Sequence, residues 1–216
     1  MKSVLGVGLV SALACGMLAS SSVRAGEPCD CGACGRSGAD KAAVKVTREI
    51  PVAGSPTRGE AGAPVTLVAF VDLECPFCVR LSRTLSELEQ RRAGALRVVI
   101  KHHPLPVHTT ARAAALAAEA AHEQGRFWPF YEALMERQDV RPAALDEAAR
   151  QAGLDLARWR KVMAHPDTER RIREDEELAQ SLAVSGTPTL FINGTRINGA
   201  QPLEDINAVV ADALRN

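Results

Sequence analysis

The sequence has no excess of charge of either sign, because 26 lysine and arginine residues are matched by 26 aspartate and glutamate residues. Proteins that bind nucleic acid through its phosphates usually carry a basic excess, so nucleic acid is not expected as a partner. The chain also lacks an internal repeat. Its 216 residues are enough for one well-packed domain and too few for two large ones.

The apolar run at residues 4–18 is too short for a membrane-spanning helix, which needs about 20 apolar residues. Lys2 precedes the run and small residues follow it as far as Ala25, a pattern typical of a secretory signal peptide. We therefore expect residues 1–25 to be a signal peptide, and the mature protein to be periplasmic or secreted. Lipoprotein anchoring at Cys15 is the less favoured alternative, because Ala12 stands where such signals usually have leucine.

The chain has six cysteine residues. Removal of the signal peptide leaves Cys29, Cys31, Cys34, Cys75 and Cys78. In an exported protein these residues indicate disulfide chemistry, and an odd number cannot all pair within one molecule.

The folded part is expected to begin near residue 44. Residues 26–43 are rich in Gly, Ala, Ser and Cys without an apolar period, which predicts a flexible linker. The alternation at residues 44–52 predicts a half-buried strand, and residues 54–64 read as a turn-rich connection. Residues 44–216 should therefore form one domain.

Apolar runs at residues 65–71 and 96–100 predict two buried strands. A helix is expected between them at residues 76–90, with Pro76 in its first turn. Further helices are expected at 109–123, 127–136, 142–152, 154–164, 168–182 and 202–214, and hairpin strands at 189–192 and 195–197. This order predicts a right-handed parallel crossover followed by a hairpin that adds an antiparallel edge.

Cys75 and Cys78 lie three residues apart at the start of the predicted helix. Residues at that spacing on a helix are about 5–6 Å apart, which a disulfide tolerates. Free N–H groups and the dipole at a helix N-terminus favour negative charge, so the pKa of Cys75 should be lowered. We expect Cys75 to be the nucleophile and the more buried Cys78 to be the resolving thiol.

Two other roles for this pair are less favoured. A structural disulfide across so short a loop would add little stability. A zinc site would need further ligands, and no second Cys-x-x-Cys or His-x-x-x-His follows, while His102, His103 and His108 are only loosely grouped.

The residues around the dithiol resemble the DsbA-like family of thioredoxin-fold proteins. The likeness is carried by residues 70–78, by 101–105 and by 184–189, and extends from about residue 44 to the C-terminus. It implies a thioredoxin-like α/β fold with a helical insertion at about residues 105–180. It also implies a cis Thr187-Pro188 bond facing the cysteines, with Thr187 presenting its backbone to substrate; a trans turn is the alternative.

Pro76 and Phe77 stand between the cysteines, where the best-known DsbA proteins carry Pro-His. Phe77 cannot donate a hydrogen bond or a positive charge to the Cys75 thiolate. We therefore expect this protein to be a weaker oxidant than the Pro-His type, because a stabilised reduced form makes a strong oxidant.

Several residues have secondary hypotheses. Asp72, Glu74 and Lys101 could move protons near the dithiol, but the favoured alternative is a structural or solvated charge, in a loop for Glu74 and at a strand end for Lys101. The aromatic side chains at residues 127–131 are expected in the core rather than in a substrate groove. Cys29, Cys31 and Cys34 could bind a soft metal or relay disulfides, but incidental thiols in a linker are favoured.

The function expected from the sequence and this resemblance is net disulfide transfer to reduced, newly exported proteins. No bound cofactor is required, because the cysteines carry the electrons. A membrane redox partner linked to quinone would reoxidise the protein, as the resemblance implies. The alternatives are a disulfide reductase or isomerase, and a non-catalytic chaperone or copper-handling protein.

Overall fold

The computed structural model describes residues 44–45 and 49–215. All of them belong to the second of two compact units, which spans Asp40–Asn216. The predicted signal peptide at residues 1–25, with Cys15, lies outside the described residues. So does the predicted linker at 26–43, with Cys29, Cys31 and Cys34.

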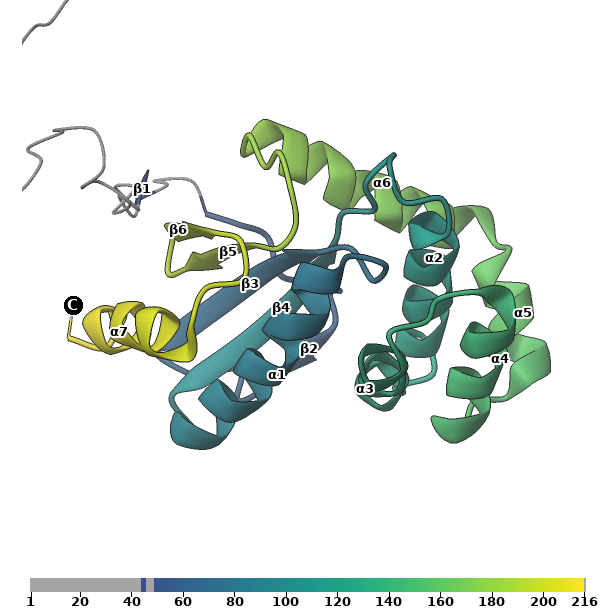
Figure 1. Ribbon diagram of the computed structural model, residues 1–216, viewed down its shortest axis with the longest axis horizontal. Helices are drawn as coiled ribbons and strands as arrows, with labels where there is room; N and C mark the ends of the chain where they lie inside the picture. The colour runs from purple at the N-terminus through teal and green to yellow at the C-terminus, as the bar shows by residue number, and fades with distance from the viewer. Residues whose placement is uncertain (1–43, 46–48, 216) are drawn as a thin grey trace, which may run out of the picture. The chain divides into compact units, whose positions relative to one another are not determined.

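One six-stranded sheet has the strand order β1-β6-β5-β3-β4-β2. The central strands β3 and β4 are parallel, and the other neighbouring pairs are antiparallel (Figure 1). The strands are β1 (Val44–Lys45), β2 (Thr57–Arg58), β3 (Val65–Val71), β4 (Leu96–His102), β5 (Thr189–Ile192) and β6 (Thr195–Asn198).

Helix α1 (Pro76–Arg91) connects β3 to β4 and covers one face of the sheet. Strand β3 is apolar and buried at almost every position, so both of its faces must be covered by helices. Pro76 occupies the first turn of α1, where its missing N–H group costs nothing. The predictions for β3 and α1 are therefore confirmed, and β4 runs two residues beyond the predicted strand.

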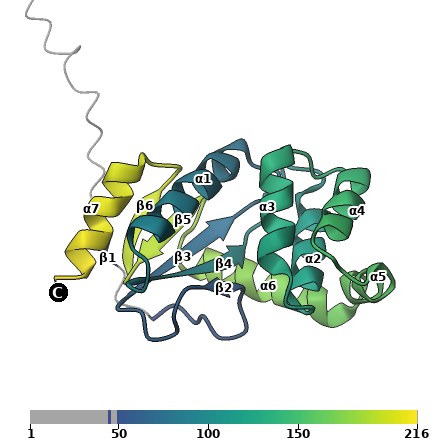
Figure 2. The same ribbon diagram turned by 90° about the horizontal axis from the view of Figure 1, so that it is seen from below.

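Five helices lie between β4 and β5 in the chain. They are α2 (Ala111–His122), α3 (Phe127–Arg137), α4 (Pro142–Gln151), α5 (Leu156–Met163) and α6 (Pro166–Ser181). Helices α2–α5 gather beyond one end of the sheet (Figure 2). Phe127, Phe130 and Tyr131 are buried there, so these three aromatic side chains belong to the core as expected. This helical block confirms the predicted insertion into a thioredoxin-like fold.

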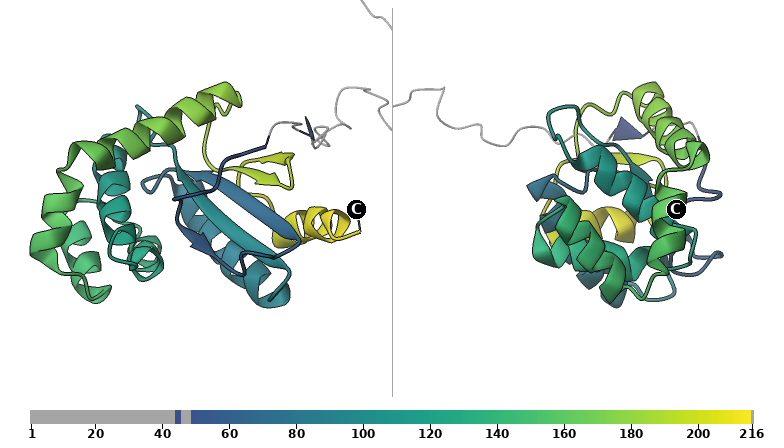
Figure 3. Two further views of the ribbon diagram at one scale, coloured as in Figure 1. Left: turned by 180° about the vertical axis from the view of Figure 1, so that it is seen from behind. Right: turned by 90° about the vertical axis from the view of Figure 1, so that its right-hand side faces the viewer.

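The two faces of the sheet have separate cores. On the first face, Leu67 of β3 packs with Leu88 of α1 and with residues of α7 (Leu203–Ala213). On the second, Val68 belongs to a cluster with Leu178 near the end of α6. Figure 3 shows α6 running over the sheet on the side away from α1. Because β-strand side chains alternate between faces, both cores are built from the same strands.

Three details of the sheet differ from the sequence prediction. In the described part of 44–52, only β1 is a strand. Strand β2 lies inside the segment that was predicted to be a connection, and it pairs with β4. Strand β6 was expected to be the edge of the sheet, but β1 pairs with its outer side. Two-residue strands carry no periodic pattern, and only their tertiary partners determine that they pair.

Candidate active site

Cys75 is the N-cap residue of α1, and Cys78 lies one turn into the helix. Cys75 has extended backbone angles, with φ −72° and ψ 121°, and its carbonyl oxygen accepts the Cys78 N–H at 2.9 Å. Both cysteines are free thiols, so the structure represents the reduced form. Cys75 is 4% exposed and Cys78 is fully buried, which is the difference in burial expected from the sequence.

The two thiols have opposite pKa shifts. A hydrogen bond from the Cys78 thiol, with further help from the Cys78 backbone N–H, lowers the pKa of Cys75 to about 5 against the opposing effect of burial. Burial raises the pKa of Cys78 well above its usual value. At neutral pH the reduced pair is therefore a Cys75 thiolate beside a Cys78 thiol, which suits Cys75 as the attacking and leaving sulfur.

The segment before β5 forms the opposite wall of the site. The Thr187-Pro188 bond is cis, as the family resemblance implied. The Cys75 sulfur lies 3.4 Å from the Thr187 carbonyl oxygen, and in its protonated form it donates a hydrogen bond to that oxygen. The Thr187 hydroxyl oxygen is buried, and the Thr187 side chain helps to lower the pKa of Cys75. Thr187 thus places backbone and side-chain polar groups next to the nucleophile.

Phe77 is the exposed member of the Cys75–Cys78 segment. Its side chain is 51% exposed, and the Arg80 guanidinium lies 4.6 Å from the centre of its ring. Pro76 starts the helix beside it. An exposed aromatic ring next to a reactive sulfur offers an apolar contact to an approaching polypeptide.

Asp72 is buried directly behind the dithiol. Its backbone N–H points at the Cys78 sulfur at 3.5 Å, and its carbonyl oxygen accepts the Cys75 N–H at 3.1 Å. One carboxylate oxygen accepts the Glu74 N–H, and the other accepts the Leu105 N–H, each at 2.8 Å. Asp72 is therefore a buried residue that joins the dithiol segment to the loop after β4, and its side chain is not exposed to solvent.

Glu74 fastens the dithiol segment to the start of α2. Its carboxylate accepts hydrogen bonds from the N–H of Thr110 at 2.8 Å and from the Thr110 hydroxyl at 2.7 Å. Thr110 is the N-cap residue of α2, so Glu74 supplies the acceptor that the free N–H groups at this helix end require. The contacts of Glu74 are structural, because they join the dithiol segment to the N-terminus of α2.

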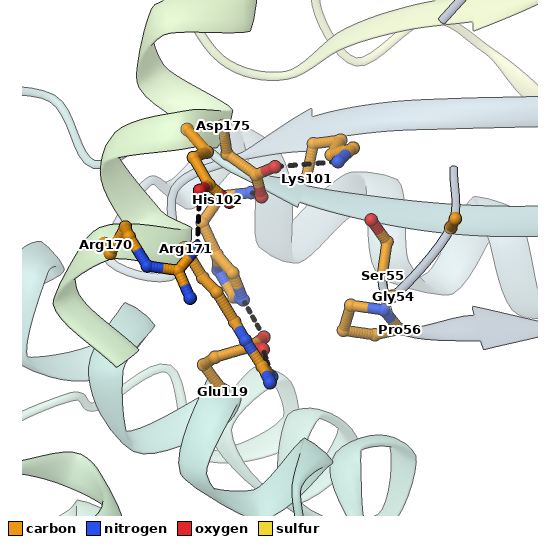
Figure 4. A pocket seen from close by; sticks show the side chains of 11 residues that line it. Gly54, Ser55, Pro56, Lys101, His102, Glu119, Arg170, Arg171 and Asp175 are labelled. Carbon is orange, nitrogen blue, oxygen red and sulfur yellow. Dashed lines mark hydrogen bonds and ion pairs between the residues drawn. The ribbon is translucent and has the colours of Figure 1, made fainter. Parts of the chain in front are cut away.

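Lys101 is placed away from the dithiol. Its ammonium nitrogen lies 2.8 Å from the Asp175 carboxylate of α6, as Figure 4 shows, and both side chains are nearly buried. They line a polar cavity of about 240 Å³ on the second face of the sheet. No hydrogen bond in the described chain joins Lys101 to either thiol, so its proton-transfer role stays a prediction without a supporting contact.

His108 belongs to the site, although its sequence position gave no sign of this. Its Nδ1 atom lies 2.7 Å from the Asp72 carboxylate. The hydrogen bond to Asp72 is the main cause that raises the pKa of His108, against burial, and the charges of Cys75 and Glu74 act in the same direction. From the sequence, His108 was only one of three loosely grouped histidines. Nothing in the spacing of these histidines shows that residues 103–110 fold back onto the end of β3.

The described residues contain no cluster of three side chains suited to a metal ion. The metal hypothesis for Cys29, Cys31 and Cys34 concerns residues outside that part of the chain. Among the helices that the structure describes, none is both long and apolar enough to span a membrane.

Known proteins that resemble this chain include a sequence family, curated relatives and solved structures. The family model described as Thioredoxin matches residues 52–212, which is most of the chain. Curated relatives include the Na(+)/H(+) antiporter NhaA 3 of Salinispora tropica, which is 42% identical over 158 residues, covering 72% of this chain and 24% of the antiporter. The antiporter NhaA of Herminiimonas arsenicoxydans is 33% identical over 160 residues, covering 73% and 25%. The chain thus spans about a quarter of the length of these curated relatives.

Similar solved structures are thioredoxin-like proteins. A thioredoxin-like oxidoreductase from Silicibacter pomeroyi has a TM-score of 0.70 and 28% identity, covering 75% of this chain and 93% of the other. A periplasmic thioredoxin-like protein from Salmonella enterica serovar Typhimurium gives 0.69 and 26%, covering 78% and 100%. Oxidised BdbD from Bacillus subtilis gives 0.70 and 25%, covering 81% and 99%.

The sheet, the helical insertion and the dithiol opposite Pro188 define the fold of a thiol–disulfide oxidoreductase. The chain belongs to the DsbA-like family of thioredoxin-fold proteins.

Proposed function

We propose that the protein is an exported oxidase that introduces disulfides into reduced proteins through Cys75 and Cys78. The observation that carries the proposal is the dithiol at the start of α1, where Cys75 at the N-cap lies 3.4 Å from the Thr187 carbonyl oxygen and Cys78 is buried. This arrangement lowers the pKa of Cys75 to about 5, mainly through the Cys78 thiol. A thiolate stabilised in the reduced form makes the corresponding disulfide easier to reduce and therefore more oxidising. The size of the shift favours an oxidase over a reductase, because the pKa of about 5 lies below the value of roughly 7 at the corresponding cysteine of thioredoxin.

The reaction is a pair of thiol–disulfide exchanges. A substrate thiolate attacks the Cys75 sulfur of the Cys75–Cys78 disulfide, the S–S bond breaks, and Cys78 leaves and takes up a proton. A second substrate thiolate attacks the substrate sulfur of the mixed disulfide, and Cys75 leaves as a thiolate. Two electrons pass from the substrate dithiol to the protein; one substrate proton ends on Cys78 and the other in solvent.

The local geometry supports these steps. A leaving thiol with a low pKa departs faster, so the release of Cys75 is favoured. The raised pKa of Cys78 favours its protonation once the protein disulfide opens. Thr187 offers its backbone beside Cys75 to an extended substrate segment.

Export and reoxidation belong to the same proposal. The predicted signal peptide and the likeness to a periplasmic protein support an oxidising compartment. The reduced protein then requires an acceptor for two electrons, and we assign this role to a membrane redox partner linked to quinone. We do not propose ion antiport for this protein, because the region that matches the NhaA relatives is only about a quarter of their length.

A peptide-oxidation assay tests the proposal. The oxidised full-length chain should convert a reduced peptide with two thiols to its disulfide form at a rate proportional to protein concentration. Cys75→Ser should abolish this conversion, whereas Ser55→Ala, a change remote from the dithiol, should leave it intact. Equal peptide oxidation by the Cys75→Ser variant would overturn the proposal, and wild-type protein that oxidises no peptide would favour a non-catalytic binding role.

Acid trapping of the protein in cells tests the direction of electron flow. An oxidase should be found mostly with Cys75 and Cys78 joined, since its acceptor keeps it oxidised. A pool that is mostly reduced would instead support a disulfide reductase or isomerase.

A further inference from the structure

A second charged group lies beside the dithiol and takes no part in the exchange steps above. His108 lies in the loop between β4 and α2, and its Nδ1 atom contacts the Asp72 carboxylate at 2.7 Å. Asp72 in turn contacts both cysteines through its backbone, accepting the Cys75 N–H and directing its own N–H at the Cys78 sulfur. His108 and Cys75 are therefore held by the same buried residue.

The loop that carries His108 is fixed at both ends. Near its start, the Leu105 N–H donates to the same Asp72 oxygen at 2.8 Å. At its end, Thr110 donates two hydrogen bonds to Glu74, the residue next to Cys75. Between them, the His108 N–H donates to the Leu105 carbonyl oxygen at 2.9 Å, which closes a turn. The backbone of His108 is thus fixed between two anchored residues, Leu105 and Thr110.

The charges around His108 favour its protonated form. Asp72 acts first, by its hydrogen bond, and the charges of Cys75 and Glu74 add to it, so the pKa of His108 is raised above its ordinary value. His103, in the same loop, differs: burial lowers its pKa, with Glu176 of α6 and Asp72 opposing. Another cation nearby, Arg80, lies over the Phe77 ring.

We propose that His108, held by Asp72, is a positioning residue whose positive charge stabilises the Cys75 thiolate and thereby raises the oxidising power of the dithiol. The inference rests on the proposed function and deepens it. Phe77 can supply no such charge from between the cysteines, whereas His108 supplies it from outside that segment. Since electrostatic coupling is reciprocal, the thiolate that favours imidazolium at His108 is favoured by it to the same extent.

The sign of the effect follows from the two protonation states. Between the pKa of Cys75, about 5, and the raised pKa of His108, the reduced protein holds a thiolate and an imidazolium. The oxidised protein has no thiolate for the cation to stabilise. The imidazolium therefore favours the reduced form, and this contribution is lost as the pH rises through the pKa of His108.

The first test is the redox equilibrium with glutathione for the wild-type protein and for His108→Asn. At a pH of about 6 we expect the variant to reduce the equilibrium constant for reduction of the protein disulfide about threefold, or about 14 mV at 29.6 mV per tenfold change. The difference should shrink as the pH rises through the pKa of His108 and vanish above it, where the imidazole is neutral. His103→Asn, the matched change in the same loop, should behave as wild type.

Two results of this test would overturn the inference. One is an equilibrium constant for His108→Asn equal to that of wild type at the lower pH. The other is a difference that persists unchanged above the pKa of His108, which is what a purely structural role of His108 would produce. Circular dichroism of the variant checks that it is folded.

The second test leaves His108 in place and so does not depend on the folding of His108→Asn. NMR titration of the His108 ring in the reduced protein should give a pKa about half a unit higher than in Cys75→Ser, the counterpart of a threefold coupling. Identical values would overturn the inference. Wild-type protein that fails to oxidise peptides would overturn the proposed function instead, and an active protein with no His108 coupling would overturn only the inference.

Discussion

At the residue scale, the two cysteines at the start of α1 differ in pKa because they occupy different positions in the helix. Cys75 is at the N-cap, where it accepts hydrogen bonds from the Cys78 thiol and the Cys78 backbone N–H, and its pKa is about 5. Cys78 is buried one turn further in, and burial raises its pKa. A spacing of three residues thus gives one sulfur that is a good nucleophile and leaving group, and one that stays protonated.

Phe77 is the residue between the cysteines that should limit oxidising power. Phe77→His would add a hydrogen-bond donor and a positive charge beside the Cys75 thiolate, so the reduced form should gain stability. We expect the equilibrium constant for reduction by glutathione to rise about tenfold, or about 30 mV. The same redox titration on Phe77→Leu, which changes shape without adding charge, should give a value close to wild type. A Phe77→His protein that is no more oxidising would show that charge at this position does not set the potential.

At the element scale, one buried ion pair joins the sheet to the helical insertion. Lys101 of β4 contacts Asp175 of α6 at 2.8 Å, and the other Asp175 oxygen accepts the His102 N–H at 2.8 Å. Burial raises the pKa of Asp175, so the charged carboxylate depends on Lys101. The pair fixes where α6 crosses the second face of the sheet.

Lys101→Met should therefore affect stability rather than chemistry. Removing one partner of a buried pair leaves an uncompensated charge, and we expect the free energy of unfolding to fall by about 3–5 kcal/mol. Urea denaturation measures this loss, and the double variant with Asp175→Asn, which keeps an acceptor for His102, should recover most of it. Peptide oxidation per folded molecule should stay at the wild-type level. A selective loss of that activity would instead support the proton-transfer hypothesis for Lys101.

The elements that the sequence predicted well are those whose own residues determine them. Strand β3 is apolar at every position except Thr66, and α1 has Pro76 at its start and an apolar face including Leu81 and Leu88. Strand β2 and the His108–Asp72 contact could not be predicted. Each depends on a partner distant in the chain, β4 for the strand and the end of β3 for His108, and neither leaves a periodic signal.

At the scale of the whole molecule, the fold brings together three segments that lie far apart in the chain. The end of β3 supplies Asp72 and the cysteines, the loop before α2 supplies His108, and the segment before β5 supplies Thr187 and Pro188. The family resemblance predicted the third segment from its Thr-Pro pair. The second is a property of the tertiary structure alone, because the helical insertion determines where its loop returns.

The central claim is that Cys75 is the sulfur through which this protein exchanges disulfides with other proteins. Cys78→Ser removes the thiol that would release a mixed disulfide, so the variant should accumulate covalent complexes when it is expressed in its native cell. We expect complexes that are cleaved by reductant and that mass spectrometry of their peptides assigns to Cys75. Two results would contradict the account. One is that a protein carrying both Cys75→Ser and Cys78→Ser forms such complexes equally well. The other is that Cys78→Ser forms no complex at all.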